Sequence, residues 1–94
     1  MFYSAASIWE VAIKSALRRR DFTADPAVLV RALGRSGFSE LPVTAAHAAR
    51  VARLPAIHRD PFDRLLVAQS LVEPMTLLTN DAALLGYGPL VQLV

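Results

Sequence analysis

The chain has 94 residues, which fits one small domain with its own core and leaves little room for a second. It has no cysteine, which excludes disulfides, thiolate nucleophiles and cysteine-bound zinc. It shows neither an export signal nor an apolar run long enough to cross a bilayer, so we expect a cytoplasmic protein without a membrane segment. The net charge is +2, with nine arginines among ten basic residues, which favours an anionic partner. The hydrophobic fraction of 54% is high enough to suggest an incomplete or oligomeric chain.

Short apolar runs alternate with helical patterns along the chain, which indicates an α/β fold. The predicted order is strand, helix, helix, strand, helix, helix, strand, helix, strand. In this order the elements cover residues 1–5, 7–20, 26–37, 38–43, 45–54, 61–72, 75–80, 82–86 and 90–94. The arginines at the end of the first helix, Arg18 to Arg20, suit a helix C-terminus whatever the function.

Most of the predicted helices follow a residue that can cap them, and Gly37 can close the second helix. The candidate N-caps are Ser4 or Ser7, Asp25, Thr44, Asp60 and Asp81. In HRDPFDRLLVAQ, residues 58–69, Asp60 as N-cap, Pro61 at the first helical position and Asp63 three residues after Asp60 come close to a capping box. Capping is therefore one interpretation of these aspartates, and metal binding is the other.

Four carboxylates fall where a parallel sheet would gather them. Glu10 lies in the first turns after the first strand, Asp60 and Asp63 begin a helix, and Asp81 directly follows a strand. Side chains beyond the carboxyl ends of parallel strands converge on one crevice, so Glu10 and Asp81 could face each other there with Asp63. Clustered carboxylates suit Mg²⁺, which could activate water and screen phosphate in phosphodiester hydrolysis. The alternatives are a Glu10 pair with Lys14 on the helix surface and a purely capping Asp81.

Other polar residues have ordinary structural interpretations as well. His58 is expected to make hydrogen bonds in a loop, because no second histidine lies at metal-ligand spacing, and His47 lies in a helix with no partner predicted. Thr79 and Asn80 end a strand, where they either orient ligands through hydrogen bonds or only shape the turn.

Four motifs together resemble those of the PIN-domain family, most closely its VapC-type toxins of bacterial toxin–antitoxin pairs. They are SAASIWEVAIK, LPVTAAHAARVARLP, HRDPFDRLLVAQS and LLTND, in this order over essentially the whole chain. The resemblance implies a compact parallel sheet flanked by helices and an acidic cluster that binds Mg²⁺ or Mn²⁺ and cuts RNA. It also implies a cognate antitoxin that blocks the site and a homodimer of the complete protein.

The resemblance assigns residues by motif. Glu10, Asp63 and Asp81 match the family's acidic residues and would ligate the metal or hold its water. Asp60 belongs to the RDPFD signature and would cap the helix or support the ligands from behind, and Thr79 and Asn80 belong to the turn before Asp81. The basic side chains that could contact RNA phosphate or balance the carboxylates are Lys14 and Arg64.

The chain also departs from the family pattern at its start. Family members begin with a strand that ends in an aspartate, well before the SAAS segment, whereas Met1 lies just before that segment. We therefore expect residues 1–94 to form a partial PIN domain whose parallel sheet lacks the family's first strand, the adjoining helices and one acidic ligand. The alternative function is a catalytically inactive remnant that binds only an antitoxin or another copy of itself.

Overall fold

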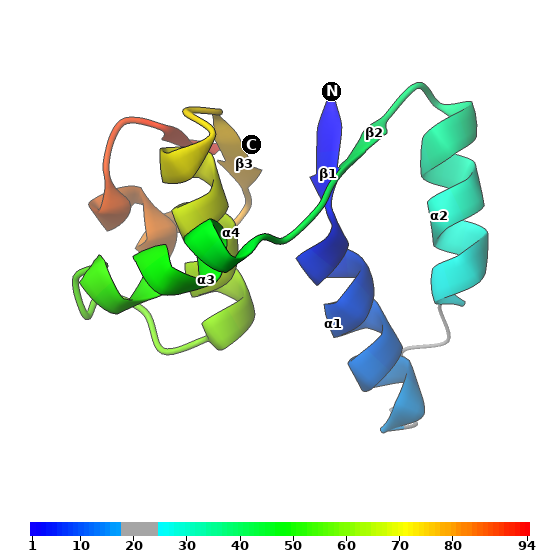
Figure 1. The fold of residues 1–94 in the computed structure, drawn as a ribbon, viewed down its shortest axis with the longest axis horizontal. Coiled ribbons are helices and arrows are strands. Elements are labelled where there is room, and N and C mark those ends of the chain that lie inside the picture. The colour runs from blue at the N-terminus through cyan, green and yellow to red at the C-terminus, as the bar shows by residue number, and fades with distance from the viewer. Residues whose placement is uncertain (18–24) are drawn as a thin grey trace. The chain divides into compact units, whose positions relative to one another are not determined.

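The computed structural model describes residues 1–17 and 25–94 (Figure 1). Within these residues the chain forms two compact units, Met1–Pro42 and Val43–Val94, each of which carries one two-stranded parallel sheet. The mixed α/β fold with parallel strands is therefore confirmed. The described strands are only three residues long and form two separate pairs, where one parallel sheet was expected.

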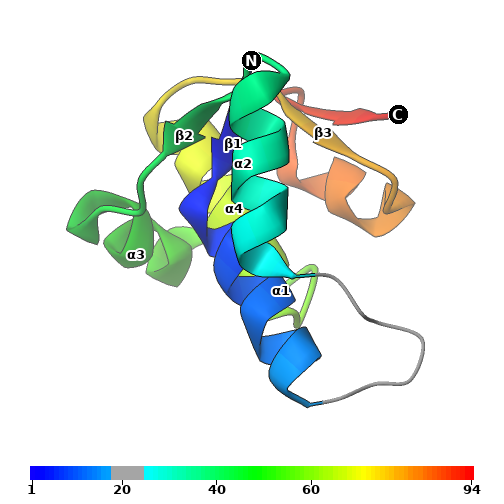
Figure 2. The ribbon, with the colours of Figure 1, turned by 90° about the vertical axis from the view of Figure 1, so that its right-hand side faces the viewer.

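In its described residues the first unit has two strands with two helices between them. In chain order it contains β1 (Phe2–Ser4), α1 (Ala5–Ala16), α2 (Pro26–Arg35) and β2 (Ser39–Leu41). The two strands pair in parallel, with Tyr3 opposite Glu40, and α1 packs against α2 (Figures 1 and 2). The two helices make the connection long enough for β2 to run parallel to β1.

The structure shows which of the two candidate serines, Ser4 and Ser7, caps α1. Ser4 accepts a hydrogen bond from the backbone N–H of Ala6 through its Oγ, at 3.1 Å, so the helix begins at Ala5, earlier than predicted. It ends at Ala16, where the predicted helix continued to residue 20. The arginine run Arg18–Arg20 lies outside the described residues.

Asp25 and Gly37 close the two ends of α2 as predicted, although the helix itself ends at Arg35, two residues before the end of the predicted range. Asp25 accepts from the N–H of Ala27 at 2.9 Å, with Pro26 at the first helical position. At the other end Gly37 adopts φ +88°, and the N–H groups of Gly37 and Phe38 return to the carbonyls of Gly34 and Leu33. This is a Schellman motif, whose left-handed position favours glycine.

The second unit packs helices against a short parallel strand pair (Figures 1 and 2). In chain order it contains α3 (Ala45–Arg50), the 3₁₀ helix η1 (Val51–Arg53), α4 (Pro61–Val72), β3 (Leu77–Thr79), the 3₁₀ helix η2 (Ala82–Tyr87) and β4 (Val91–Leu93). Its buried apolar cluster joins both 3₁₀ segments, α4 and β4 and consists of Leu54, Val67, Ala68, Leu84, Tyr87 and Val91. Because α4 contributes Val67 and Ala68, the two apolar core residues with no exposed surface, it is the central element of this unit.

The helix predicted over residues 45–54 divides into α3 and η1. An α-helix through this stretch would give the carbonyl of Val51 the N–H of residue 55, but Pro55 has none. The carbonyl accepts instead from the N–H of Leu54 at 3.2 Å, an i to i+3 bond, and from Arg64 Nη2 at 3.2 Å. The last turn therefore tightens into 3₁₀ geometry.

His47, for which no partner was predicted, is fully buried and has three. The predicted cap Thr44 accepts from the N–H of His47 through its Oγ1, and its own N–H donates to His47 Nδ1 at 3.0 Å. The Nε2 atom lies 2.6 Å from Glu73 Oε2, and the Gln69 amide nitrogen lies 3.4 Å from Nδ1. The ring therefore connects the start of α3 to the end of α4.

Candidate functional site

The first part of the site is the N-terminus of α4. Asp60 caps this helix as predicted: its Oδ1 accepts from the N–H groups of Phe62 at 2.8 Å and Asp63 at 3.2 Å. The N–H of Asp60 itself donates to His58 Nδ1 at 3.0 Å. In a complete capping box the Asp63 side chain would accept that N–H. The box is thus half formed, and His58 takes the place of Asp63 in it.

The second part of the site is the turn after β3. The N–H of Asp81 donates to Thr79 Oγ1 at 3.1 Å, so the threonine hydroxyl shapes this turn. Asp81 Oδ1 accepts from the N–H of Ala83 at 3.0 Å and caps η2, as predicted. Its other oxygen, Oδ2, lies 3.0 Å from His58 Nε2. Asp81 therefore caps η2 with one carboxylate oxygen and contacts His58 with the other. Asn80 lies exposed within the turn.

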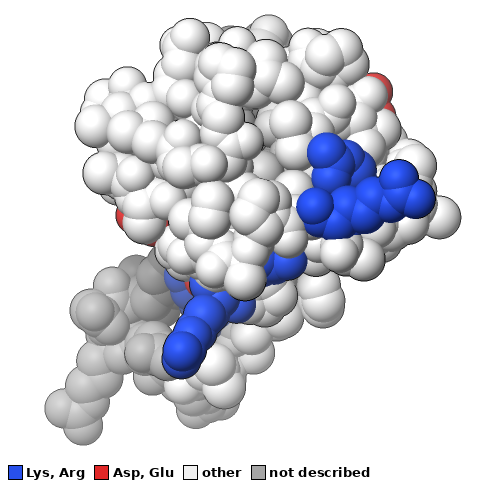
Figure 3. Space-filling view, turned by 90° about the vertical axis from the view of Figure 1, so that its left-hand side faces the viewer, with Lys and Arg blue, Asp and Glu red and all other residues white. Residues whose placement is uncertain are grey.

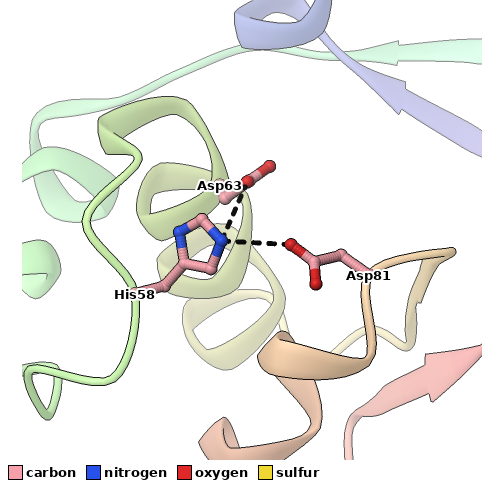
Figure 4. Close-up of side chains that lie close together, drawn as sticks. All are labelled: His58, Asp63 and Asp81. Carbon is pink, nitrogen blue, oxygen red and sulfur yellow. Dashed lines mark hydrogen bonds and ion pairs between the residues drawn. The ribbon is translucent and has the colours of Figure 1, made fainter.

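These segments bring His58, Asp63 and Asp81 together (Figure 4). His58 Nε2 lies 3.8 Å from Asp63 Oδ2, and one ligand atom from each of the three side chains lies within 4.8 Å of the other two. All three residues are partly buried. A histidine nitrogen and two carboxylate oxygens form a donor set that Mg²⁺ or Mn²⁺ can use, with water completing the shell.

The loop that carries His58 is fixed by side chains from elsewhere in the unit. The N–H of His58 donates to the Tyr87 hydroxyl at 2.9 Å. Arg64 Nη1 donates to that hydroxyl at 3.3 Å and to the carbonyls of Pro55 and His58 at 3.1 and 3.4 Å, while Nη2 donates to Val51. Arg64, for which the resemblance suggested contact with RNA phosphate or balance of the carboxylates, thus has a structural role.

Glu10 lies on α1 in the first unit, apart from the second unit's cluster in sequence. Its Oε2 lies 3.2 Å from Lys14 Nζ, at i, i+4 spacing on the helix. This is the ion pair that the sequence analysis gave as the alternative to metal binding. A role of Glu10 beside Asp63 and Asp81 stays a prediction.

Sequence reasoning brought Asp63 and Asp81 forward and expected His58 to make hydrogen bonds in its loop, which it does, but it did not place His58 beside the aspartates and left out Tyr87. The available signal for His58 was its position two residues before the cap Asp60, where a side chain can turn back to the helix start. The Tyr87 hydroxyl lies 29 residues from His58 along the chain, so no local pattern indicates their contact.

Basic side chains are available on the surface. Arg50 and Arg53 line a hollow with Ala46, Ala49 and Val72. Figure 3 shows one face on which basic side chains gather in groups, while few acidic atoms are visible among the described residues of that face. Arginines on an exposed surface favour phosphate-rich partners.

One of the comparisons with known proteins, that with protein families, agrees with the fold class. Among the helices of residues 1–17 and 25–94, none combines the length and hydropathy that crossing a membrane requires. No curated protein and no solved structure matches the chain significantly. The PIN domain family matches residues 1–87. The chain therefore belongs to the PIN domain family.

Proposed function

We propose that the chain is a Mg²⁺- or Mn²⁺-dependent endoribonuclease whose metal is held by Asp63 and Asp81, with Glu10 as a third acidic residue. PIN domains are generally metal-dependent nucleases, which supports this activity class. The single observation that carries the proposal is the approach of Asp63 and Asp81 to each other, from the start of α4 and the turn after β3.

Electrostatics supports a cation at this point. Two carboxylates at this separation repel each other unless a cation or a hydrogen-bond donor lies near both. A divalent cation held there would screen the phosphodiester charge and activate the attacking water. The arginines that line the surface hollow, the partly buried Arg50 and the exposed Arg53, would supply positive charge for the RNA backbone.

The biological role that we propose is that of a VapC-type toxin in the cytoplasm. Its partners would be RNA, a cognate antitoxin that blocks the site and a second copy of the chain. This part of the proposal depends on the four family motifs, of which HRDPFD and LLTND carry the residues of the cluster.

Substitution of Asp63 by Asn tests the activity. The Asp63→Asn variant removes one negative charge from the cluster at nearly constant volume, and we expect it to abolish Mg²⁺-dependent cleavage of an RNA substrate. The matched control is Glu40→Gln, which neutralises an exposed carboxylate on β2 and should cleave normally. Unchanged cleavage by Asp63→Asn, in protein that unfolds at the wild-type temperature, would reject the assignment.

The alternative is a binding module without catalysis, and one observation favours it. In the described residues each sheet has two strands, and Phe2, Leu78 and Leu93 on those strands are about half exposed. Apolar strands with unpaired edges can pair with another chain. This alternative predicts a stable complex with an antitoxin or a second copy and no RNA cleavage by the wild-type chain. Recovery of neither complex in a pull-down would count against it.

A further inference from the structure

His58 lies between the two carboxylates of the site, and two roles are open to its ring. Its Nε2 atom is 3.0 Å from Asp81 Oδ2 and 3.8 Å from Asp63 Oδ2. By distance alone the ring could bind a cation together with both aspartates. It could equally be a hydrogen-bond donor that holds a carboxylate in place. The two roles require different tautomers of the ring.

The tautomer follows from the other ring nitrogen. The backbone N–H of Asp60 donates to His58 Nδ1 at 3.0 Å, so Nδ1 presents a lone pair and bears no hydrogen. A neutral imidazole has one donor and one acceptor nitrogen, which places the hydrogen on Nε2. A histidine that ligates a metal through Nε2 needs its lone pair there and usually donates from Nδ1 to an acceptor. The surroundings of His58 are the reverse of that arrangement.

The position of the ring is set independently of any metal. The loop N–H of His58 donates to the Tyr87 hydroxyl, and the His58 carbonyl accepts from Arg64. Asp60, whose N–H holds the ring, is itself held as the cap of α4. The ring is thus attached at its backbone and at Nδ1, and its Nε2–H group points to the carboxylates from a fixed place.

The Asp81 carboxylate is held at both oxygens as a result. Oδ1 accepts from the N–H of Ala83 and Oδ2 accepts from His58 Nε2–H. Each carboxylate oxygen can accept two bonds, so both oxygens keep one acceptor position for a cation. At 3.8 Å, Asp63 Oδ2 is beyond hydrogen-bond distance from Nε2. His58 therefore fixes the Asp81 carboxylate by a hydrogen bond and lies at ion-pair distance from Asp63.

We propose that His58 is the positioning residue of this site and not a metal ligand: its Nε2–H group holds the Asp81 carboxylate beside Asp63. The proposal depends on the metal-binding function given above. It deepens that function because it limits the protein ligands of the cation in this unit to carboxylate oxygens. Such ligands favour Mg²⁺ and Mn²⁺ over the softer ions that histidine attracts.

Nuclear magnetic resonance can determine the tautomer without any metal. The chain has two histidines, and ¹⁵N-labelled rings give long-range proton couplings that show which nitrogen bears the hydrogen. We expect His58 to bear its hydrogen on Nε2 in the metal-free protein, with the His58→Asn spectrum identifying its signals. A hydrogen on Nδ1 of His58 would overturn the proposal.

Pulsed electron paramagnetic resonance of the Mn²⁺-loaded protein tests the ligand set directly. We expect no coupling from a directly bound histidine nitrogen, and a coupling that disappears in His58→Gln would overturn the proposal. Failure to bind Mn²⁺ at all would instead reject the metal site, and the tautomer in the metal-free protein would still decide whether Nε2–H faces Asp81.

Two matched variants separate positioning from simple loss of structure. The amide of His58→Gln can reach Asp81 as a donor, whereas the shorter His58→Asn keeps an acceptor for the Asp60 N–H but cannot reach Asp81. Loss of a residue that orients a ligand typically lowers metal affinity about 10- to 100-fold. We expect that loss for His58→Asn and a smaller one for His58→Gln in Mn²⁺ titration calorimetry. Equal affinities in the two variants would overturn the proposal.

Discussion

The two histidines of the chain use the same hydrogen-bond pattern for different ends. Each ring accepts a backbone N–H at Nδ1, His47 from Thr44 and His58 from Asp60, and each presents Nε2 to a carboxylate. His47 is fully buried against Glu73 and joins two helices. His58 is partly exposed and faces Asp81 with Asp63 near. A second carboxylate and access to solvent distinguish the candidate site from the structural pair.

Arg64 illustrates how a residue assigned from a motif can carry structure. We expect Arg64→Ala to lower the free energy of unfolding by about 2 kcal/mol, because the carbonyls of Pro55 and Val51 and the Tyr87 hydroxyl lose a charged donor. Urea denaturation measures this loss. The control is Arg59→Ala, which removes an exposed arginine of the same loop and should leave the unfolding free energy unchanged.

The same variant separates the two roles of Arg64. If its guanidinium also contacts phosphate, Arg64→Ala weakens RNA binding more at low salt than at high salt. A loss of binding that does not depend on salt removes the phosphate role. Wild-type stability of Arg64→Ala would contradict the structural role.

At the scale of elements, the sequence predicted what is decided locally. Asp25, Thr44, Asp60 and Asp81 each cap the helix that follows them, because a short side chain and the N–H groups of the next turn are close in sequence. The division of residues 45–54 was only partly predictable: Pro55 removes the helical donor of the Val51 carbonyl locally, but the Arg64 donor that also bonds this carbonyl lies more than ten residues away. The separate roles of the two Asp81 oxygens were missed for the same reason.

Asp60 offers a test of capping against metal binding. Asp60→Asn keeps an oxygen acceptor for the N–H groups of Phe62 and Asp63, while Asp60→Ala removes it. We expect Asp60→Ala to lower the free energy of unfolding by about 1 kcal/mol and Asp60→Asn to lower it less. Thermal unfolding measures stability, and RNA cleavage by Asp60→Asn should stay near the wild-type rate. Abolished cleavage in a stable Asp60→Asn protein would show that its charge acts in the site.

At the scale of the whole molecule, the strongest prediction joins residues from both units. The test compares the Mn²⁺ affinities of Glu10→Gln, Asp81→Asn and the double variant. If Glu10 ligates the same cation as Asp81, the loss of binding free energy in the double variant should differ from the sum of the two single losses, because residues of one site couple. Titration calorimetry measures the cycle. Additive losses would place Glu10 outside the site.

Lys14 supplies the control for this cycle. Lys14→Met removes the ion-pair partner of Glu10 and leaves the carboxylate in place. If Glu10 only pairs with Lys14, the two single variants should change Mn²⁺ affinity equally little. A larger effect of Glu10→Gln would favour a metal-binding role.

The whole-molecule arrangement was the least predictable from sequence. Periodicity and the family motifs indicated parallel strands and helices, and the strands do pair in parallel. The number of strands in a sheet depends on which strand edges pair with one another. Strands of three residues are too short for the sequence to indicate which strands pair. The convergence of Glu10 and Asp81 was inferred from a single sheet, and because the two residues belong to different units it stays a prediction.

The hydroxyl of Tyr87 couples the local stability of the His58 loop to that of the C-terminal segment. It accepts from His58 and from Arg64, and its ring lies in the buried cluster beside Leu84 and Val91. Segments that share buried contacts and hydrogen bonds open together as one cooperative unit. Local unfolding of η2 and β4 would release the His58 loop in the same step, so amide exchange at His58, although outside any helix or strand, should follow the opening of the chain's last residues.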